Sequence, residues 1–139
     1  MKKDLYHDYR ATSVLNPVSV SNNATGNGTG TDLLGYKGAL MIASVGAVGA
    51  LFDASNYYTV KFLESSNNTV FSAIADTDLV GGNNTVVIDA NNEANCVHQR
   101  GYIGSARYVT VSIACTGTLT APATAIIIKG FPLHAPIAD

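Results

Sequence analysis

Hydrophobic and polar residues alternate along residues 107–115, which show the most regular pattern in the chain. In an extended strand, Val109, Val111, Ile113 and Cys115 fall on one face and the residues between them fall on the other. This period of two is typical of a half-buried β-strand whose aliphatic face meets a core. The stretch therefore predicts an inner strand of a β protein.

Similar patterns recur about every ten residues, separated by polar turns rich in Asn, Gly and Ser. Residues 57–65 alternate with Tyr58, Val60 and Phe62 on one face, and residues 69–74 return after a polar loop, which predicts a hairpin. A further segment is expected to direct Val86 and Ile88 inward. The expected strands are residues 11–20, 39–45, 57–65, 69–74, 84–90, 107–115 and 124–129, with one more strand around His98 in residues 96–103, which lead back toward residues 107–115.

Two of these segments have special positions. Residues 39–45 are almost continuously apolar, which predicts a central strand covered on both faces, or a strand packed against another subunit. Residues 11–20 contain Pro17, which cannot donate to a β-ladder and so places the segment at a sheet edge or a bulge.

About eight short strands without a helical period predict an all-β protein, a single-domain β-sandwich or jelly roll, with a barrel as the open alternative. A chain of 139 residues forms one domain by length. We expect that domain at residues 11–130, with an extended N-terminal arm at 1–10 and an extended C-terminal tail at 131–139. Two prolines in residues 130–136 predict that this segment does not continue a ladder.

The charge balance argues against two classes of partner. Only 13% of the residues are charged and the net charge is −2, so there is no positive field to attract a phosphate backbone and no nucleic acid is expected. The longest apolar run, residues 39–52, is shorter than the roughly 20 residues that span a bilayer. No membrane association is therefore expected.

The residues that commonly bind metals or cofactors are dispersed. His7, His98 and His134 lie in separate segments, without His-x-His or Cys-x-x-Cys spacing that would preset a metal site. Asp76 and Asp78 begin like a calcium loop but lack its other ligands, so a solvated turn or a helical cap is expected. The glycine-rich residues 21–30 lack the Lys-Ser/Thr of nucleotide-binding loops. No metal and no cofactor are predicted.

The chain also lacks the usual signatures of an enzyme. Cys96 and His98 would share a face of a strand, but no electropositive cleft that would activate the thiolate is visible. No Gly-x-Ser-x-Gly motif occurs, and the carboxylates show no pairing for glycoside hydrolysis. We expect no enzymatic activity. Cys96 and Cys115 are expected to be reduced, with one disulfide as the less favoured state.

A turn at residues 101–104 precedes the best strand and contains two glycines. Arg100 and Arg107 flank it, and we expect it to present Tyr102 and both arginines near one edge of the sheet. Arginine can bind a partner's carboxylate through two hydrogen bonds, although a solvated arginine beside a turn explains the pattern equally well. Arg100, Tyr102 and Arg107 are candidate partner-binding residues.

Four segments together resemble a family of small structural proteins of tailed phages, encoded beside the major capsid protein and comparable to capsid decoration or cement proteins. The segments are Asp-Leu-Leu-Gly-Tyr-Lys-Gly-Ala-Leu at 32–40, Lys-Phe-Leu-Glu-Ser-Ser-Asn-Asn-Thr-Val-Phe at 61–71, Gly-Tyr-Ile-Gly-Ser-Ala-Arg-Tyr-Val-Thr-Val at 101–111 and Gly-Phe-Pro-Leu-His-Ala-Pro at 130–136.

The resemblance implies a virion protein on the capsid exterior, made in the cytoplasm of a bacterial host. Such a protein would bind the major capsid protein and stabilise the head, as a homo-oligomer for which a trimer is favoured. The competing hypothesis is a phage tail or host-surface adhesion module whose Asn- and Tyr-rich loops bind carbohydrate.

Under the capsid hypothesis both ends of the chain become docking segments. By residue type, the anchor candidates of the N-terminal arm are Leu5, Tyr6, Tyr9 and Arg10. Without a partner, this arm is expected to be a frayed terminus. The candidates in the C-terminal tail are Phe131 and His134.

Overall fold

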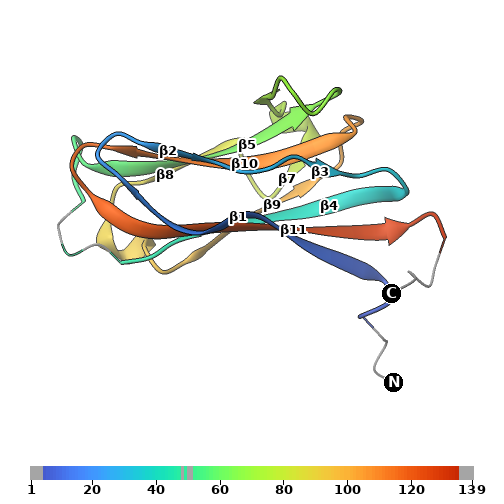
Figure 1. The fold of residues 1–139 in the computed structure, drawn as a ribbon, viewed down its shortest axis with the longest axis horizontal. Helices are drawn as coiled ribbons and strands as arrows, with labels where there is room; N and C mark the ends of the chain where they lie inside the picture. The colour runs from blue at the N-terminus through green and yellow to red at the C-terminus, as the bar shows by residue number, and fades with distance from the viewer. Residues whose placement is uncertain (1–4, 48, 50–51, 135–139) are drawn as a thin grey trace.

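The computed structural model describes residues 5–47, 49 and 52–134. Over these residues the chain forms eleven strands and two short 3-10 helices, and the strands pack as two antiparallel sheets (Figure 1). The predicted all-β sandwich is confirmed. Residues 1–4 of the expected arm and 135–139 of the expected tail lie outside the described part.

Sheet A has the strand order β1-β11-β4-β9-β7, and sheet B has the order β2-β10-β5-β6, with β3 pairing β10 and β8 pairing β5. The strands of sheet A are β1 (Tyr9–Ser21), β4 (Tyr36–Val45), β7 (Leu79–Val80), β9 (Val97–Tyr102) and β11 (Thr120–Pro132). The strands of sheet B are β2 (Thr25–Asn27), β3 (Thr31–Asp32), β5 (Tyr57–Ser65), β6 (Ser72–Ala73), β8 (Thr85–Ile88) and β10 (Tyr108–Thr116). The 3-10 helices are η1 (Asp76–Asp78) and η2 (Asn91–Glu93).

The core lies between the two sheets and consists of the faces that the alternation predicted. Val109, Val111 and Ile113 of β10 are fully buried, as are the inward side chains of β5 and Ile88 of β8. From sheet A, β4 and β11 contribute alternate residues such as Met41 and Ile127. The period of two therefore identified the core-facing side of these strands correctly.

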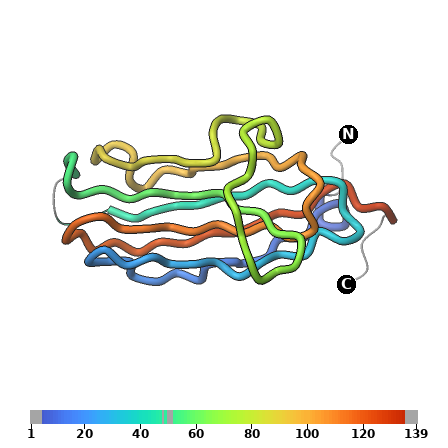
Figure 2. Tube along the Cα trace, turned by 90° about the horizontal axis from the view of Figure 1, so that it is seen from above, coloured from blue at the N-terminus to red at the C-terminus, as the bar shows by residue number. Residues whose placement is uncertain are grey.

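Part of the outer face of sheet B is covered by the chain itself. Figure 2 shows the segment after β5 crossing over the strands of this sheet before it returns to β6. Asn68 and Phe71 of that segment lie beside Gly30, which is on the far side of β10 from β5. Thr110 and Ser112, expected on the polar face of a half-buried strand, are buried as well, and the Thr110 hydroxyl donates to the Thr29 carbonyl at 3.0 Å.

The expected hairpin is shorter than the alternation suggested. Only Ser72 and Ala73 pair with β5, so residues 69–71, expected to be strand, form part of a longer loop. The cause is local, because the Asn67 side chain accepts hydrogen bonds from the backbone N–H groups of Thr69 and Val70 at 3.0 Å each. These bonds turn the backbone instead of extending it.

The edge prediction for the first strand is confirmed. Strand β1 lies at one edge of sheet A, and its register with β11 shifts between Ser13 and Leu15 and again between Leu15 and Val18. Pro17 falls within the second irregularity, where a missing backbone donor does not interrupt a regular ladder.

The strands at both ends of the domain extend further than expected. Tyr9 and Arg10, assigned to the arm, pair with Gly130 and Lys129 as the first residues of β1. At the other end β11 continues through Pro132, although two prolines had predicted that the ladder would stop earlier. Pro132 occupies the last paired position, and the next backbone N–H, that of Leu133, donates to the Gly35 carbonyl at 2.8 Å.

Candidate functional site

One end of the sandwich carries both described chain ends and most of the exposed large hydrophobic side chains (Figure 1). We call this region the terminal end. Elsewhere in the described part of the chain the exposed large hydrophobic residues are valines. Those of the terminal end are Leu5, Tyr6, Tyr9, Leu34, Ile103, Phe131 and Leu133.

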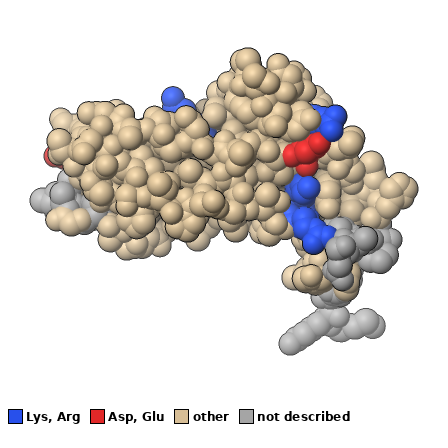
Figure 3. All heavy atoms as spheres, viewed as in Figure 1, with Lys and Arg blue, Asp and Glu red and all other residues tan. Residues whose placement is uncertain are grey.

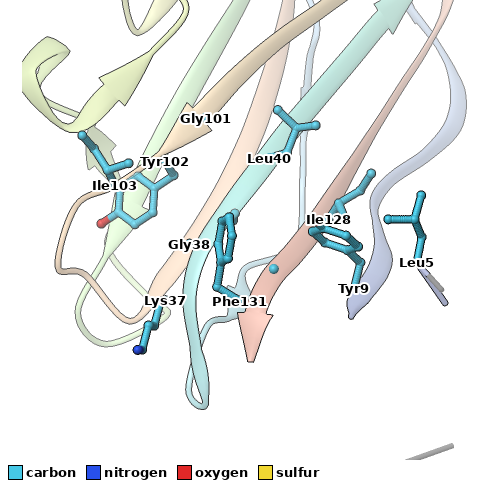
Figure 4. A pocket seen from close by; sticks show the side chains of 12 residues that line it. Leu5, Tyr9, Lys37, Gly38, Leu40, Gly101, Tyr102, Ile103, Ile128 and Phe131 are labelled. Atoms are coloured by element: carbon cyan, nitrogen blue, oxygen red, sulfur yellow. The ribbon is translucent and has the colours of Figure 1, made fainter. Parts of the chain in front are cut away.

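A hollow of about 530 Å³ opens at the terminal end on the outer face of sheet A. In Figure 4 the ring of Phe131 lies beside Gly38, and Tyr9 and Leu5 extend the lining beyond Ile128. Its lining is almost entirely apolar, with Lys37 as its charged residue. A surface of this kind suits an apolar group of another molecule better than a reacting polar substrate.

The floor of the hollow exists because three neighbouring strands have glycine there. Gly38 of β4 pairs directly with Gly130 of β11, and Gly101 of β9 pairs with Leu40. Alternation places all three glycines on the outer face, since Ala39 of β4 points into the core. Because these three glycines have no side chains, the floor of the hollow stays low, and the neighbouring side chains form its walls.

Phe131 reaches the hollow through an unusual backbone conformation. Its φ is +55°, which is a genuine outlier for a bulky residue, and its side chain is 67% exposed. Regular alternation would direct residue 131 toward the opposite face from residue 130. Strain that places an exposed aromatic ring beside a hollow indicates a functional position.

Tyr102 forms the inner wall of the hollow and is not presented at the surface, which corrects the prediction for this turn. The ring is 2% exposed, and its hydroxyl donates to Glu64 Oε2 at 2.6 Å and accepts from the Ala106 N–H at 2.8 Å. Burial first, and then the bond to the Glu64 carboxylate, raise the pKa of Tyr102, so the phenol stays protonated. The bond joins β9 of sheet A to β5 of sheet B.

The turn itself begins later than expected, because Gly101 and Tyr102 are the last residues of β9. Alternation directs Tyr102 toward the core together with Arg100 and His98. Arg100 donates from Nε to the Asn83 carbonyl at 2.8 Å, and its guanidinium lies 5.5 Å from the ring centre of Phe62. The Arg100 side chain therefore makes its contacts within the chain and does not line the hollow.

Arg107 binds a carboxylate in the two-bonded geometry that was expected, but the carboxylate belongs to the same chain. Its Nε donates to Asp32 Oδ1 at 3.0 Å and its Nη2 to Oδ2 at 2.7 Å. Lys129 donates to the Asp32 carbonyl at 3.3 Å and packs on the ring of Tyr36. In Figure 3 the charged side chains of this view gather mainly in one band near the terminal end, and most of the remaining surface is uncharged.

Acidification should weaken the Asp32–Arg107 pair. Chiefly the hydrogen bonds from Arg107, and also the Leu34 N–H, hold the pKa of Asp32 below its ordinary value of 3.8. Because the folded pKa is the lower one, the stabilisation is present above 3.8 and is lost as the pH falls through the folded pKa. We expect a small effect: the wild type loses stability relative to Asp32→Asn on acidification. Urea unfolding of both proteins, from pH values above 3.8 down through the folded pKa of Asp32, measures the difference between their free energies of unfolding. A difference that does not change with pH would contradict the prediction.

The remaining sequence candidates are dispersed. Tyr6 and His134 are exposed at the terminal end, and the Tyr6 ring packs edge-on against His7 at 5.2 Å. Arg10 is half-buried in β1. Of the nine candidates, Leu5, Tyr9, Tyr102 and Phe131 line the hollow, and their binding role stays a prediction.

Sequence reasoning missed the rest of the lining, which apart from Lys37 consists of glycine, alanine and aliphatic residues without recognisable chemistry: Gly38, Ala39, Leu40, Gly101, Ile103, Ile128 and Gly130. The signal that was available is glycine inside strand-like segments, which often marks a place where something approaches the backbone.

The cysteines, histidines and acidic residues form no alternative site in the described part of the chain. Cys96 is exposed, Cys115 is buried, and both are free. Within the same residues no three metal-binding side chains lie together, and no helix is long and apolar enough to cross a bilayer. His98 is half-buried, and its Nε2 lies 3.1 Å from the Glu93 carbonyl oxygen. Asp76 accepts a hydrogen bond from the Asn84 N–H beside η1.

No family model matches this sequence, and no curated protein matches it. Solved structures share the fold. The PBSX exported protein XepA superposes with a TM-score of 0.60 at 14% identity, over 94% of this chain and 40% of that chain. This chain therefore spans less than half the length of XepA.

Two further likenesses are weaker. The SPBc2 prophage-derived protein YomS superposes with a TM-score of 0.50 at 12% identity, over 88% of this chain and 92% of that chain. The structure of infectious bursal disease virus Gx strain superposes with a TM-score of 0.46 at 6% identity, over 92% of this chain and 33% of that chain. This likeness is too low to support an inference. At these identities the likeness establishes the fold alone.

Proposed function

We propose that this chain is a structural protein of a phage particle that decorates the head, binds the major capsid protein and stabilises the shell. The observation that carries the proposal is the apolar hollow at the terminal end, built by both ends of the chain around a strained, exposed Phe131. Its wall presents no cluster of available polar groups, because the hydroxyl of Tyr102 is hydrogen-bonded within the chain. Such a surface suits contact with a protein.

Two independent likenesses support the same class of protein. The sequence resembles head-module proteins of tailed phages in four segments that occur in the same order. The fold is shared with two proteins whose names assign them to the prophages PBSX and SPBc2. In this role the protein is an oligomeric clamp on the capsid exterior and catalyses no reaction.

The particle itself provides the test. Quantitative mass spectrometry of purified particles should find this chain in far more copies than a tail protein, and electron cryo-microscopy should place it on the head. Heads that lack the chain should open at lower temperature than complete heads. Few copies at the tail would favour the adhesion alternative, and equal heat resistance of both heads would contradict the clamp.

Removal of residues 1–8 tests the N-terminal segment without cutting β1, which begins at Tyr9. The truncation removes Leu5, one wall of the hollow, and the exposed ring of Tyr6. We expect the truncated protein to fold with an unchanged unfolding midpoint and to occupy fewer sites on particles that lack the wild-type chain. Full occupancy at equal protein concentration would show that this segment does not contribute to docking.

A further inference from the structure

The middle of the outer face of sheet A carries no charged side chain, and Lys37 lies at its terminal end. Alternate residues from Gly38 to Ser44 of β4, from Thr124 to Gly130 of β11 and from Val97 to Gly101 of β9 point away from the core. None of these outward residues is Asp, Glu, Lys or Arg. Leu40 and Ile42 stand directly opposite Ile128 and Ile126, so large aliphatic side chains form the centre of this face.

The two sheets differ in what covers them. The segment after β5 crosses the outer face of sheet B (Figure 2), whereas Figure 1 shows no described segment along the middle of the outer face of sheet A. Leu40, Ile42, Ile126 and Ile128 are consequently only half-buried. A contiguous apolar area of this kind is rare on a monomeric protein and marks an interaction surface.

The edges of sheet A are poorly suited to pairing with another chain. Strand β1 carries Pro17 and two irregularities of register, and β7, at the opposite edge, contains only Leu79 and Val80. Prolines, irregular register and short strands at an edge all oppose edge-to-edge addition of strands. Association through this sheet therefore involves its face.

We propose that two copies of this chain associate face to face through the outer faces of sheet A. A patch of one charge sign would select a partner of the opposite sign, but an uncharged patch meets its own copy without repulsion. The inference explains why residues 39–45 are apolar on both sides: one side meets sheet B, and the other meets the second copy. Association of the purified chain does not depend on its role in the particle.

The size and shape of the face set the expected stoichiometry and strength. Four strands (β1, β11, β4 and β9) about 4.8 Å apart, each contributing about seven residues that rise about 3.4 Å, give roughly 450 Å² for each copy, at the lower limit of specific interfaces. The dimer should therefore be weak. The same flat patch on both copies closes after two subunits, so we expect a dimer in place of the trimer that the resemblance favoured.

Charge substitution at the centre of the face tests the proposal. Ile42→Lys should weaken dimerisation at least about tenfold in sedimentation-equilibrium measurements, because each copy would place an ammonium group against an apolar partner. Thr59→Lys is the matched control, since Thr59 is half-buried on the outer face of β5 in sheet B. The control should dimerise as the wild type does. If Ile42→Lys does not fold, the milder Ile126→Thr replaces it.

Three outcomes would overturn the proposal. A wild-type chain that stays monomeric up to about 1 mM lacks this association. A dimer or trimer that Ile42→Lys leaves unchanged associates through another surface. A monomeric wild type whose particle binding is lost in Ile42→Lys would show that a different protein covers this face. Failure of the proposed function is recognised separately, by absence of the wild-type chain from purified heads.

Discussion

Replacement of Tyr102 by alanine is expected to lower the free energy of unfolding by about 3–5 kcal/mol, the range for large aromatic side chains removed from a core. The ring is 2% exposed and packs within the core cluster at the end of β9. Its loss leaves a cavity and also removes the hydroxyl that bonds Glu64 of the opposite sheet. The effect should be large because packing and a connection between the sheets are lost together.

Tyr102→Phe separates the two contributions. It keeps the ring but leaves the Ala106 N–H and the Glu64 carboxylate without the phenol, for which we expect a loss of about 1–3 kcal/mol. Urea unfolding followed by circular dichroism measures both variants. Tyr6→Ala is the control, because its ring is 68% exposed and its removal should change stability by less than about 0.5 kcal/mol.

A loss below about 1 kcal/mol for Tyr102→Ala would mean that the ring is not a core residue in solution. The turn would then present Tyr102 to a partner, as its position beside two glycines had first indicated. The stability measurement thus decides between a structural role and a docking role for the same residue.

The sequence predicts the long strands well, because each has one face against the core. The side chains of β5, β8 and β10 alternate in type, and the apolar positions mark the core-facing side of each strand, although Thr110 and Ser112 of β10 are buried on the other side as well. By contrast β2, β3 and β7 are two or three residues long and exist through pairing with β10 or β9. Such short segments carry no period of their own, so local sequence cannot reveal them.

The candidate site was predicted less well, for two physical reasons. Residues were selected by type, which found Leu5, Tyr9 and Phe131 but not the glycines that leave the hollow open. The direction of a side chain depends on where a strand ends, and β9 extends through Tyr102 and directs it inward. Neither the end of that strand nor the strained φ of Phe131 is a local property of the sequence.

Gly38→Val should block the hollow while leaving the fold intact. A Cβ at Gly38 would lie 3.4 Å from the Tyr102 carbonyl oxygen and 3.7 Å from Phe131 Cδ2, which are ordinary contacts. Valine favours extended backbone, whereas glycine within a strand costs about 0.5–1 kcal/mol relative to alanine. The free energy of unfolding should therefore stay unchanged or rise slightly, and the added methyl groups should occupy the space that a docked side chain needs.

Binding of the purified variant to particles that lack the chain measures the effect, and we expect affinity to fall at least about tenfold. Gly49→Val is the matched control, because a Cβ there meets no atom within 4 Å and the residue lies outside the hollow. The comparison with Ile42→Lys separates the two roles, since Ile42 lies outside the hollow and its substitution should weaken the dimer at least about tenfold. Wild-type affinity in a stably folded Gly38→Val protein would show that docking does not use the hollow.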